Sequence, residues 1–464
     1  MAGPVPAALA RRLPGLAAAL DGEAAAASVQ QLLLQPGTSV QSAVTHSVWV
    51  RSDGTCSLRY RVSVTQPSGG STEHVVLGRV CPDRASAAAY VSGQVLPLGS
   101  SGRVHGHPWR TSAAVWDEAA VGLHPFPLDP TLPTLSRALD RTYIGRLLGP
   151  GGRLPPASVR VVRHARDGAC VLGYGSTDAE PHAYGKVYAD DAGRAVCAFL
   201  DDIPRAGLTS DSVPVLLPRA LAYDAAARLL ITSAVPGTPD LASLLAEATA
   251  ASSGEGPPPA AARAHALLAD CGRVLAGFHS MPASIASVHP MAAELVTVRA
   301  ALEQVAPIWP SAAAEVTHHL SGLVMDVDTD QPPVLCHGDF TPAQLLLKDG
   351  LIRGLVDLDT VCWADPALDL GRFLAHADLA TAKATGDPSH ASAGSLADSL
   401  LRGYLDAAPY AFAGDRLLPR IAAYRALSLA RSALRGCRQL KTIRAQLALS
   451  VLRTAGSWTK GVSP

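Results

Sequence analysis

The pattern of apolar and polar residues changes from helical to strand-like within the first hundred residues. Apolar residues recur at three- and four-residue steps over Pro6–Leu20 and Glu23–Leu34, which predicts two helices. From Thr45 to Tyr90, alternating apolar and polar residues and a loop rich in Gly and Ser predict strands, and ASAAAYV at the end predicts a helix. The chain therefore begins with helices followed by strands.

Part of this strand-rich pattern occurs twice. The segment Val50–Tyr60 aligns with His164–Tyr174 at a constant offset, with matching Asp-Gly, Cys, Leu and Tyr. Further along, LGRVC aligns with YGKVY, so that Arg79 lies opposite Lys186. We interpret the two copies as a duplicated unit of a β-hairpin plus a strand. A chance similarity between two short strand-rich segments is the alternative.

Proline-rich and glycine-rich segments divide the chain into three parts. The proline spacing after Pro125 predicts an extended linker, followed by a helix over Leu135–Leu148. A strand within Leu229–Asp240 is stopped by Pro-Gly, and a long helix over Ala262–His279 follows. We expect an N-terminal extension over residues 1–125, a β-rich part over residues 126–235 and a helical part over residues 236–464.

Composition narrows the function classes. The 464 residues are enough for two or three domains, and the formal net charge of zero suggests neither a nucleic-acid partner nor a membrane partner. The eight cysteines are scattered without a CxxC pair, which is typical of buried thiols in the reducing cytoplasm. No apolar run reaches the ~20 residues of a membrane span. We expect a cytoplasmic protein that is a monomer or a homodimer.

The stretch with the clearest chemistry is LCHGDFTPAQLLLKDGLIRGLVDLD, which begins at Leu335. Two short apolar runs, Gln344–Leu347 and Leu351–Val356, predict buried strands, and Asp349-Gly350 predicts the turn that pairs them antiparallel. Polar side chains gather at one end of this hairpin: His337, Asp339, Gln344, Asp357 and Asp359.

This set of oxygen donors fits Mg²⁺ and the transfer of a phosphoryl group. We expect Asp339 to accept the proton of the attacking hydroxyl, and Gln344, Asp357 and Asp359 to surround the metal. His337 would orient the Asp339 loop through hydrogen bonds. The alternative for each acid alone is that it caps a helix or a turn, as Asp beside Gly and Pro often does.

The motifs HGDFTPAQ, LVDLD and DPALDLG together resemble the catalytic segment of the aminoglycoside phosphotransferase family, whose fold is similar to that of protein kinases. The resemblance extends from about Arg160 to the C-terminus and is specific over Leu335–Gly371. Gln344 replaces the usual Asn of that family, a difference that also resembles the maltokinase-like branch. By the same resemblance, Asp365 and Asp369 are structural.

The resemblance implies a fold and a cofactor set. The fold class is α+β: a two-lobed, protein-kinase-like fold with a β-rich N-lobe, a helical C-lobe and an N-terminal α/β extension that would be a degenerate N-lobe repeat. ATP would bind with Lys186 reaching its α- and β-phosphates, and with backbone groups of Thr232 and Ala234 at the adenine. The acids nearest in register to partner Lys186 are Asp201 and Asp202.

The acceptor is inferred from charge. The last helical segments carry many more basic than acidic residues, and a polycationic aminoglycoside calls for an acidic surface instead. The basic residues are Arg402, Arg416, Arg420, Arg425, Arg431, Arg435, Arg438, Lys441 and Arg444. A solvated face of a helix is the simpler explanation for them.

We therefore expect an ATP- and Mg²⁺-dependent kinase that phosphorylates a hydroxyl of a sugar or a related polyol or amino sugar. The alternatives are an aminoglycoside phosphotransferase, a pseudokinase or binding module, and a metal-dependent hydrolase, for which a second ligand His is missing from the motif.

Overall fold

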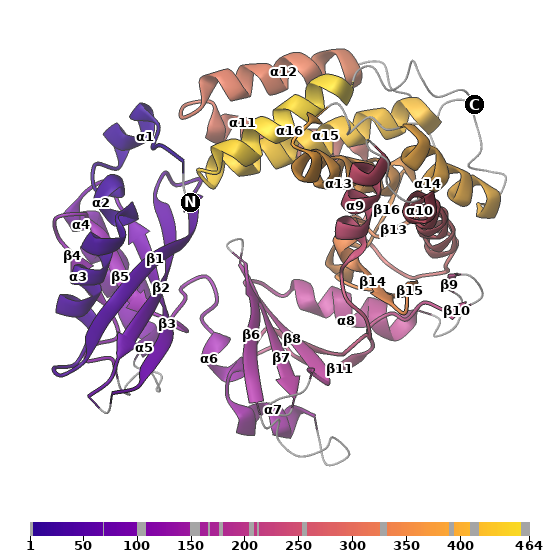
Figure 1. Cartoon of the computed structure of the whole chain (residues 1–464). Coiled ribbons are helices and arrows are strands. Elements are labelled where there is room, and N and C mark those ends of the chain that lie inside the picture. The colour runs from indigo at the N-terminus through magenta and orange to yellow at the C-terminus, as the bar shows by residue number, and fades with distance from the viewer. Residues whose placement is uncertain are drawn as a thin grey trace.

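The structure is a computed structural model of the chain. It describes residues 3–67, 69–99, 108–148, 158–165, 168–175, 180–203, 208–210, 213–252, 258–324, 332–388, 394–408 and 417–455. Across these residues, no helix is both long enough and apolar enough to cross a bilayer. Figure 1 shows two sheet-containing parts and one mainly helical part arranged around a common centre.

The N-terminal helices are shorter than the pattern predicted. In place of one helix over Pro6–Leu20 there are α1 (Ala7–Arg12) and α2 (Leu16–Leu20), because Pro14 lies between them and proline disfavours a helix interior. The second predicted helix is α3 (Gly22–Leu33), whose first turn is capped by Asp21 accepting a hydrogen bond from the Ala24 amide at 2.8 Å. The three helices pack on the first sheet.

The first sheet has five antiparallel strands in the order β1-β2-β3-β5-β4. A continuous helical segment, α4, η1 and α5, connects β3 to the last two strands. The bounds are β1 (Ser39–Val50), β2 (Cys56–Thr65), β3 (Ser71–Val80), α4 (Arg84–Tyr90), η1 (Val91–Val95), α5 (Leu96–Gly99), β4 (Ala114–Trp116) and β5 (Val121–Pro125).

The second sheet has the same strand order, read as β6-β7-β8-β12-β11. Helix α8 follows β8 as α4 follows β3, and a short hairpin, β9–β10, precedes β11. The bounds are β6 (Ser158–His164), β7 (Ala169–Gly175), β8 (Ala183–Tyr188), α8 (Ala192–Asp202), β9 (Thr209–Ser210), β10 (Val213–Pro214), β11 (Ala220–Asp224) and β12 (Leu229–Ser233).

The two hairpins whose sequences align have similar backbone conformations at their turns. Gly54 and Gly168, the glycines of the two Asp-Gly pairs, both have positive φ, at 79° and 91°. Asp167 itself lies outside the described residues. Common strand order, a helix after the third strand and matching turn glycines support the interpretation of the extension as a second copy of the N-lobe.

Between the sheets the predicted helix over Leu135–Leu148 is two short helices, α6 (Leu135–Ala138) and α7 (Arg141–Leu147). The break lies at Asp140, whose carboxylate accepts hydrogen bonds from the amides of Thr142 and Tyr143 and so begins a new helix.

The C-lobe consists of helices around two small antiparallel pairs of strands. Its helices are α9 (Leu241–Ser252), α10 (Pro258–His279), α11 (Met291–Val305), α12 (Pro310–Val324), α13 (Ala367–Thr385), α14 (Gly394–Ala407), α15 (Leu417–Arg438) and α16 (Thr442–Ala455). The predicted catalytic hairpin is β14 (Leu345–Lys348) with β15 (Leu351–Leu355), and β13 (Val334–Cys336) pairs with β16 (Cys362–Ala364). These elements confirm the α+β, two-lobed architecture expected from the sequence.

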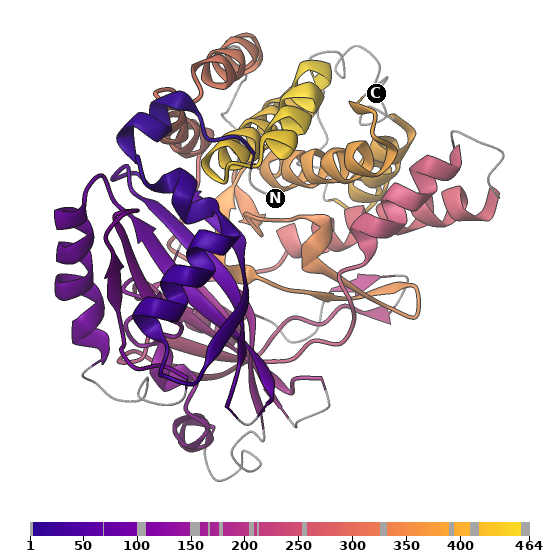
Figure 2. The same cartoon turned by 60° about the vertical axis from the view of Figure 1, so that its left-hand side comes forward.

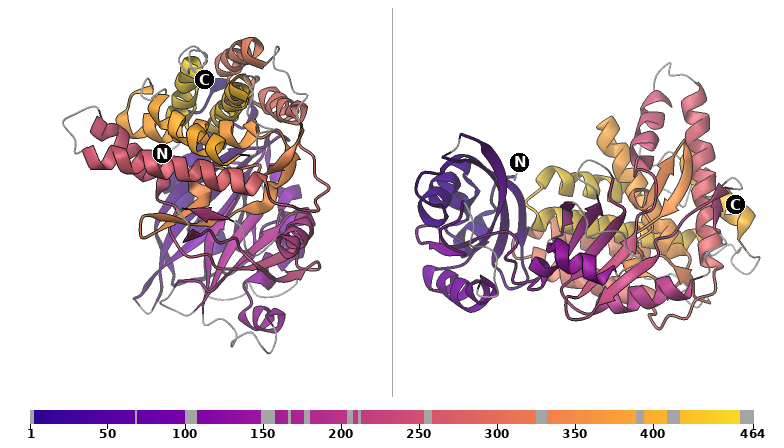
Figure 3. Two further views of the ribbon diagram at one scale, coloured as in Figure 1. Left: turned by 90° about the vertical axis from the view of Figure 1, so that its right-hand side faces the viewer. Right: turned by 90° about the horizontal axis from the view of Figure 1, so that it is seen from below.

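The extension contacts both lobes. Arg59 donates a hydrogen bond to the His164 carbonyl in the N-lobe at 2.7 Å. On the other side, the Arg438 guanidinium at the end of α15 lies 4.2 Å from the centre of the Trp49 ring and donates to the Val50 carbonyl at 3.1 Å. Figures 2 and 3 show the extension beside the C-terminal helices and the second sheet. The extension thereby joins the two lobes along one side.

Candidate functional site

Lys186 lies on β8, the central strand of the second sheet, opposite Val171 of β7 and Leu230 of β12. Its ammonium lies 2.8 Å from Asp357 Oδ1 and also forms an ion pair with Asp359 Oδ2. These two acids follow β15 in the C-lobe, so the two ion pairs connect β8 of the N-lobe to the C-lobe.

Asp201 and Asp202, the acids nearest in register on the following helix, do not pair with Lys186. Asp202 accepts a hydrogen bond from the Ser284 amide at 2.8 Å, and Asp201 contacts Cys197 on its own helix. Both acids lie at the C-terminal end of α8. Among the described residues, the ion-pair partners of Lys186 are Asp357 and Asp359.

Lys186 and Asp357 each stabilise the charged form of the other. Burial disfavours each charge, but for Lys186 the two carboxylates outweigh burial and raise its pKa. For Asp357 the ammonium likewise outweighs burial and lowers the pKa of the carboxyl. Tyr188, two residues along β8, donates its hydroxyl to Asp359 at 2.9 Å. The Lys186 ammonium and the Asp357 carboxylate are thus held charged at neutral pH.

Hydrogen bonds to Asp369 and Val356 fix the loop that carries Asp339. The fully buried Asp369 carboxylate accepts the amides of His337 at 2.6 Å and Gly338 at 2.9 Å. The Asp339 amide lies 3.3 Å from His337 Nδ1, and His337 Nε2 lies 3.0 Å from the Val356 carbonyl. His337 therefore donates from Nε2 and orients the loop, as its position in the motif predicts.

Gly338 is required by the same loop. Its φ is +77°, and a Cβ at this position would lie 2.1 Å from the Thr360 carbonyl oxygen. A side chain would displace the segment after β15. The Gly of the HGD motif therefore lets Asp339 lie close to Asp357 and Asp359.

Gln344 connects the two acids that the motif predicted for catalysis and for the metal. It ends the short helix η2 (Pro342–Gln344), and its Nε2 lies 3.5 Å from Asp339 Oδ2 and 3.4 Å from Asp357 Oδ2. Rotating the amide by 180° would present its oxygen to the same space. Asp357 itself has left-handed backbone angles, φ 64° and ψ 56°, at the end of the hairpin.

The predicted adenine-binding segment is farther from these contacts. Thr232 pairs with Tyr184 of β8 and with Ala220 of β11, and the Ala234 amide donates to the His182 carbonyl at 3.1 Å. The Ala234 amide therefore already has a hydrogen-bond partner within the N-lobe.

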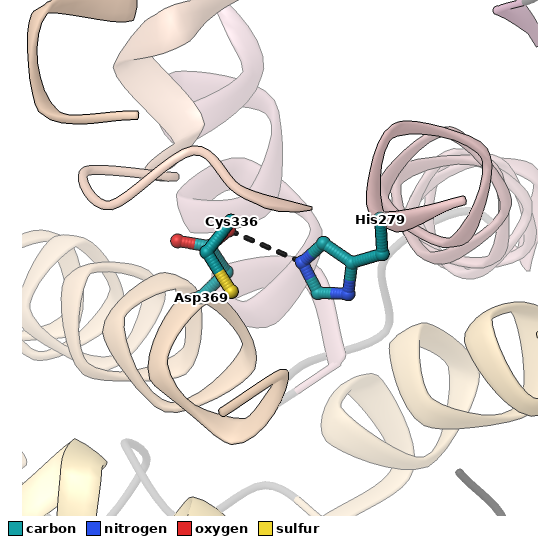
Figure 4. A group of neighbouring side chains, drawn as sticks. All are labelled: His279, Cys336 and Asp369. Carbon is teal, nitrogen blue, oxygen red and sulfur yellow. Dashed lines mark hydrogen bonds and ion pairs between the residues drawn. The ribbon is translucent and has the colours of Figure 1, made fainter. Parts of the chain in front are cut away.

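A second cluster, His279, Cys336 and Asp369, has a composition that could ligate a metal. Figure 4 shows His279 at the end of its helix facing Asp369 across a small gap. All three are buried and already have partners: His279 Nδ1 lies 3.0 Å from the Tyr404 hydroxyl, the Cys336 thiol contacts the Ala364 and Asp365 carbonyls, and Asp369 holds the HGD loop. Burial also raises the pKa of the Cys336 thiol. This cluster is structural, as the resemblance implied for Asp369.

A cavity of about 1100 Å³ opens beside Asp339 and Gln344. All three parts of the chain line it, including Trp49 and Arg51 from the extension, Arg163 from the N-lobe and Arg372 from α13. Arg372 Nη1 lies 3.9 Å from Asp339 Oδ1. This space can hold a molecule that presents a hydroxyl to Asp339.

The basic residues of the last helices are not one solvated face. Arg420 and Arg425 are buried in ion pairs with Asp365, at 2.8 Å, and Asp378, at 2.6 Å. By contrast, five others line the cavity: Arg431, Arg435, Arg438, Lys441 and Arg444. Arg416 lies outside the described residues.

Several residues at the site had not been singled out from the sequence. Tyr188 lies two residues after Lys186 in YGKVY, and residues two positions apart in a strand lie on the same face. Arg372 and His376 lie on α13 after DPALDLG, four residues apart and therefore on one helix face. No local pattern connects Trp49 or Arg51 to a site almost three hundred residues away.

Residues 187–416 match the profile of the phosphotransferase enzyme family. No curated protein matches the chain. Solved structures with similar folds include the GDP and kanamycin complex of APH(2")-IIia, which is 13% identical and covers 68% of this chain and 99% of its own, with a TM-score of 0.44.

Two further solved structures have similar folds. The complex of APH(3'')-Id from Streptomyces rimosus ATCC10970 with ADP and streptomycin is 20% identical and covers 62% of this chain and 97% of its own, with a TM-score of 0.40. A choline/ethanolamine kinase family protein from Mesorhizobium loti is 14% identical and covers 70% of this chain and 95% of its own, with a TM-score of 0.42.

Proposed function

Through residues 187–416 the chain belongs to the phosphotransferase enzyme family, and we propose on this premise that it is a kinase that uses ATP and Mg²⁺ to phosphorylate a hydroxyl of a sugar or a related polyol. The chain is a phosphotransferase that acts on the hydroxyl groups of small molecules. The nucleotide, the metal and the acceptor class are the proposed part.

The observation that carries the proposal is the chain of contacts from Asp339 through Gln344 and Asp357 to Lys186. It connects a carboxylate that faces a cavity to an ammonium on the central strand of the N-lobe. Phosphoryl transfer needs these groups at neighbouring positions: a base for the hydroxyl, oxygen ligands for a cation and a positive charge for the phosphates.

Asp339 is proposed as the group that accepts the proton of the acceptor hydroxyl. Its side chain is 43% exposed and lines the cavity, while its backbone amide is held by His337. Because the carboxylate is accessible from the cavity and its backbone is fixed, a hydroxyl can bind to it without a rearrangement of the loop.

Asp357, Asp359 and Gln344 fit a hard divalent cation. Their carboxylate and amide oxygens are the donors that Mg²⁺ prefers, and all three lie beside Lys186 or Asp339. When bound, Mg²⁺ would neutralise charge on the phosphates of the nucleotide. Lys186 would exchange part of its contact with the two acids for a contact with phosphate oxygens.

Nucleotide turnover tests this proposal. Purified protein is incubated with Mg·ATP and a panel of sugars, polyols, amino sugars and aminoglycosides, and phosphorylated product is measured by mass spectrometry beside an Asp339→Ala control. Transfer to one acceptor class that is lost in the control supports the proposal. Nucleotide binding without transfer to any acceptor contradicts the proposal and favours a pseudokinase. Equal turnover in D339A contradicts the assignment of Asp339 as the base.

A further inference from the structure

The cavity beside Asp339 is lined by an excess of positive charge. Its basic residues include Arg51, Arg163, Arg372, Arg431 and Arg444, and Asp339 is the only acid among the described lining residues. Hydroxyl compounds without charge need hydrogen-bonding groups, but not a concentration of guanidinium groups. The lining therefore needs an explanation in terms of charge.

Internal ion pairs account for only part of this charge. Glu294 of α11 is buried and accepts from Arg372 Nη2 at 2.6 Å and from Arg431 Nη1 at 2.9 Å, so one carboxylate is shared by two guanidinium groups. Arg51 lies 3.7 Å from the half-exposed Asp53. Arg372 also lies 3.9 Å from Asp339, so the two carboxylates balance the two guanidinium groups, and the lining arginines outside this group carry the excess charge.

Arg444 of α16 is the clearest case. Within the part of the chain that the structure describes, it forms neither a hydrogen bond nor an ion pair with an acid. Desolvation and the neighbouring Arg435 both lower the pKa of Arg444, although the residue is exposed to solvent beside the cavity. Two neighbouring cations repel each other, and an anion bound between them would relieve that repulsion.

His376 of α13 also lines the cavity and is affected by the same excess of positive charge. Burial lowers its pKa to about 4; Asp339 opposes this shift, whereas Arg372, Arg444 and Arg431 add to it. These are the charged groups that act on the imidazole from α13, α15, α16 and the HGD loop. His376 is therefore neutral at neutral pH and able to donate one hydrogen bond into the cavity.

We propose that the acceptor hydroxyl compound carries a phosphate group of its own, which Arg431 and Arg444 bind. This inference rests on the proposed function and narrows its acceptor from sugars or polyols to their phosphate monoesters. A phosphate dianion carries two negative charges on three oxygens and can accept from several guanidinium groups at once, whereas a carboxylate carries one charge on two oxygens. A polycationic acceptor would be repelled.

The nucleotide does not account for these arginines. Among the described residues, Lys186, Asp357 and Asp359 do not line the cavity that Arg431 and Arg444 line. Arg163 is the lining arginine whose charge lowers the pKa of Asp357, whereas Arg431 and Arg444 come from α15 and α16.

The reaction then balances as follows. The acceptor oxygen bonds to the γ-phosphorus, the bond from that phosphorus to the β–γ bridging oxygen breaks, and the hydroxyl proton goes to Asp339. ADP leaves, and the product carries two phosphate groups. The substrate must come from a reaction that produces a phosphate monoester with a free hydroxyl.

Titration with inorganic phosphate tests the anion site without turnover. The full chain is first saturated with Mg²⁺ and a non-hydrolysable ATP analogue, so that the γ-phosphate position is filled, and phosphate binding is measured by calorimetry. We expect one saturable site that is about tenfold weaker in Arg444→Gln, the loss of one charge-assisted contact. Arg453→Gln, on the same helix but paired with Glu315, is expected to bind like the wild type.

The absence of saturable binding in the wild type, or equal binding in R444Q, would overturn the inference. If R444Q does not fold, Arg444→Lys tests the same contact: it keeps the charge but loses the fork, so equal affinity to the wild type would also overturn it. If nucleotide does not bind at all, the proposed function fails, whereas the phosphate titration of R444Q against R453Q still decides whether the anion site exists.

A matched pair of acceptors separates the two claims in turnover. Glucose and glucose 6-phosphate, with analogous pairs of other sugars and polyols, are compared for product formation. Transfer confined to phosphorylated members, with the acceptor KM raised in R444Q, supports the inference. Transfer to neutral members with an unchanged KM in R444Q leaves the kinase intact and overturns the phosphate site.

Discussion

The Lys186 ammonium lies 2.8 Å from Asp357, a residue 171 positions later in the chain. The contact joins the central strand of the N-lobe to the end of the catalytic hairpin of the C-lobe. Both groups are charged, because each stabilises the charged form of the other and this effect outweighs burial. The proposed nucleotide site is thus preassembled around an ion pair.

Lys186→Met is expected to reduce the rate of phosphoryl transfer by about 10²–10³-fold and to weaken nucleotide binding, because one positive charge facing the phosphates is lost. Arg79→Met is the matched control, since Arg79 occupies the corresponding strand position in the extension but lies near Asp53 and Tyr90. Titration with a fluorescent nucleotide measures both variants. An equal loss of affinity in the two would refute the assignment of the second copy as the nucleotide-binding one.

Gln344→Leu is expected to raise the Mg²⁺ concentration needed for half-maximal transfer, because leucine removes the amide between Asp339 and Asp357 while keeping much of the volume. Gln344→Asn keeps an amide oxygen and should lie between leucine and the wild type. The measurement is initial rate against Mg²⁺ at saturating nucleotide. Identical curves for the leucine variant and the wild type would exclude Gln344 from the metal site.

Glu294 couples stability to pH. Burial alone would raise its pKa, but His289, Arg372 and Arg431 lower it to about 2, against an ordinary value of 4.5. The unfolded chain therefore binds the proton more readily, and the stabilisation is full above about pH 5.5 and disappears as pH falls toward 2. It amounts to about 3 kcal/mol at neutral pH.

Glu294→Gln should lower the free energy of unfolding by about that amount at pH 7, and the difference from the wild type should vanish as the pH approaches 2. Urea unfolding followed by circular dichroism between pH 7 and pH 3 measures it. A difference that is independent of pH would mean that Glu294 stabilises the fold through packing and not through its charge.

Arg438→Ala is expected to loosen the extension from the C-lobe. The cation–π contact with Trp49 contributes about 0.5–2 kcal/mol, and the hydrogen bond to the Val50 carbonyl is lost as well. Hydrogen exchange should become faster at the C-terminal end of β1, with Arg453→Ala as control. Unchanged protection of β1 would show that other contacts hold the extension.

Sequence patterns predicted elements whose residues are close in the chain. The catalytic hairpin followed from two apolar runs around Asp349-Gly350, and the N-lobe repeat followed from the spacing of Asp-Gly, Cys, Leu and Tyr. The breaks at Pro14 and Asp140 were missed because apolar periodicity continues across them, while proline and a capping carboxylate end each helix locally.

The site was predictable only as far as its residues lie in one motif. HGDFTPAQ and LVDLD placed Asp339, Gln344, Asp357 and Asp359 near each other, and contacts in the structure link them. The sequence did not identify the acidic partner of Lys186, because its ion-pair partners, Asp357 and Asp359, come from the other lobe. The walls of the cavity also depend on how α13, α15 and α16 pack, which a linear pattern does not encode.

The rate of phosphoryl transfer in Asp339→Asn tests the central claim most directly. Asparagine keeps the shape of the side chain but cannot accept the hydroxyl proton, so the transfer rate should fall by about 10²–10⁴-fold while nucleotide affinity stays near that of the wild type. A transfer rate close to the wild type would contradict the account, because the loop that His337, Gly338 and Asp369 hold in place would then not supply the base.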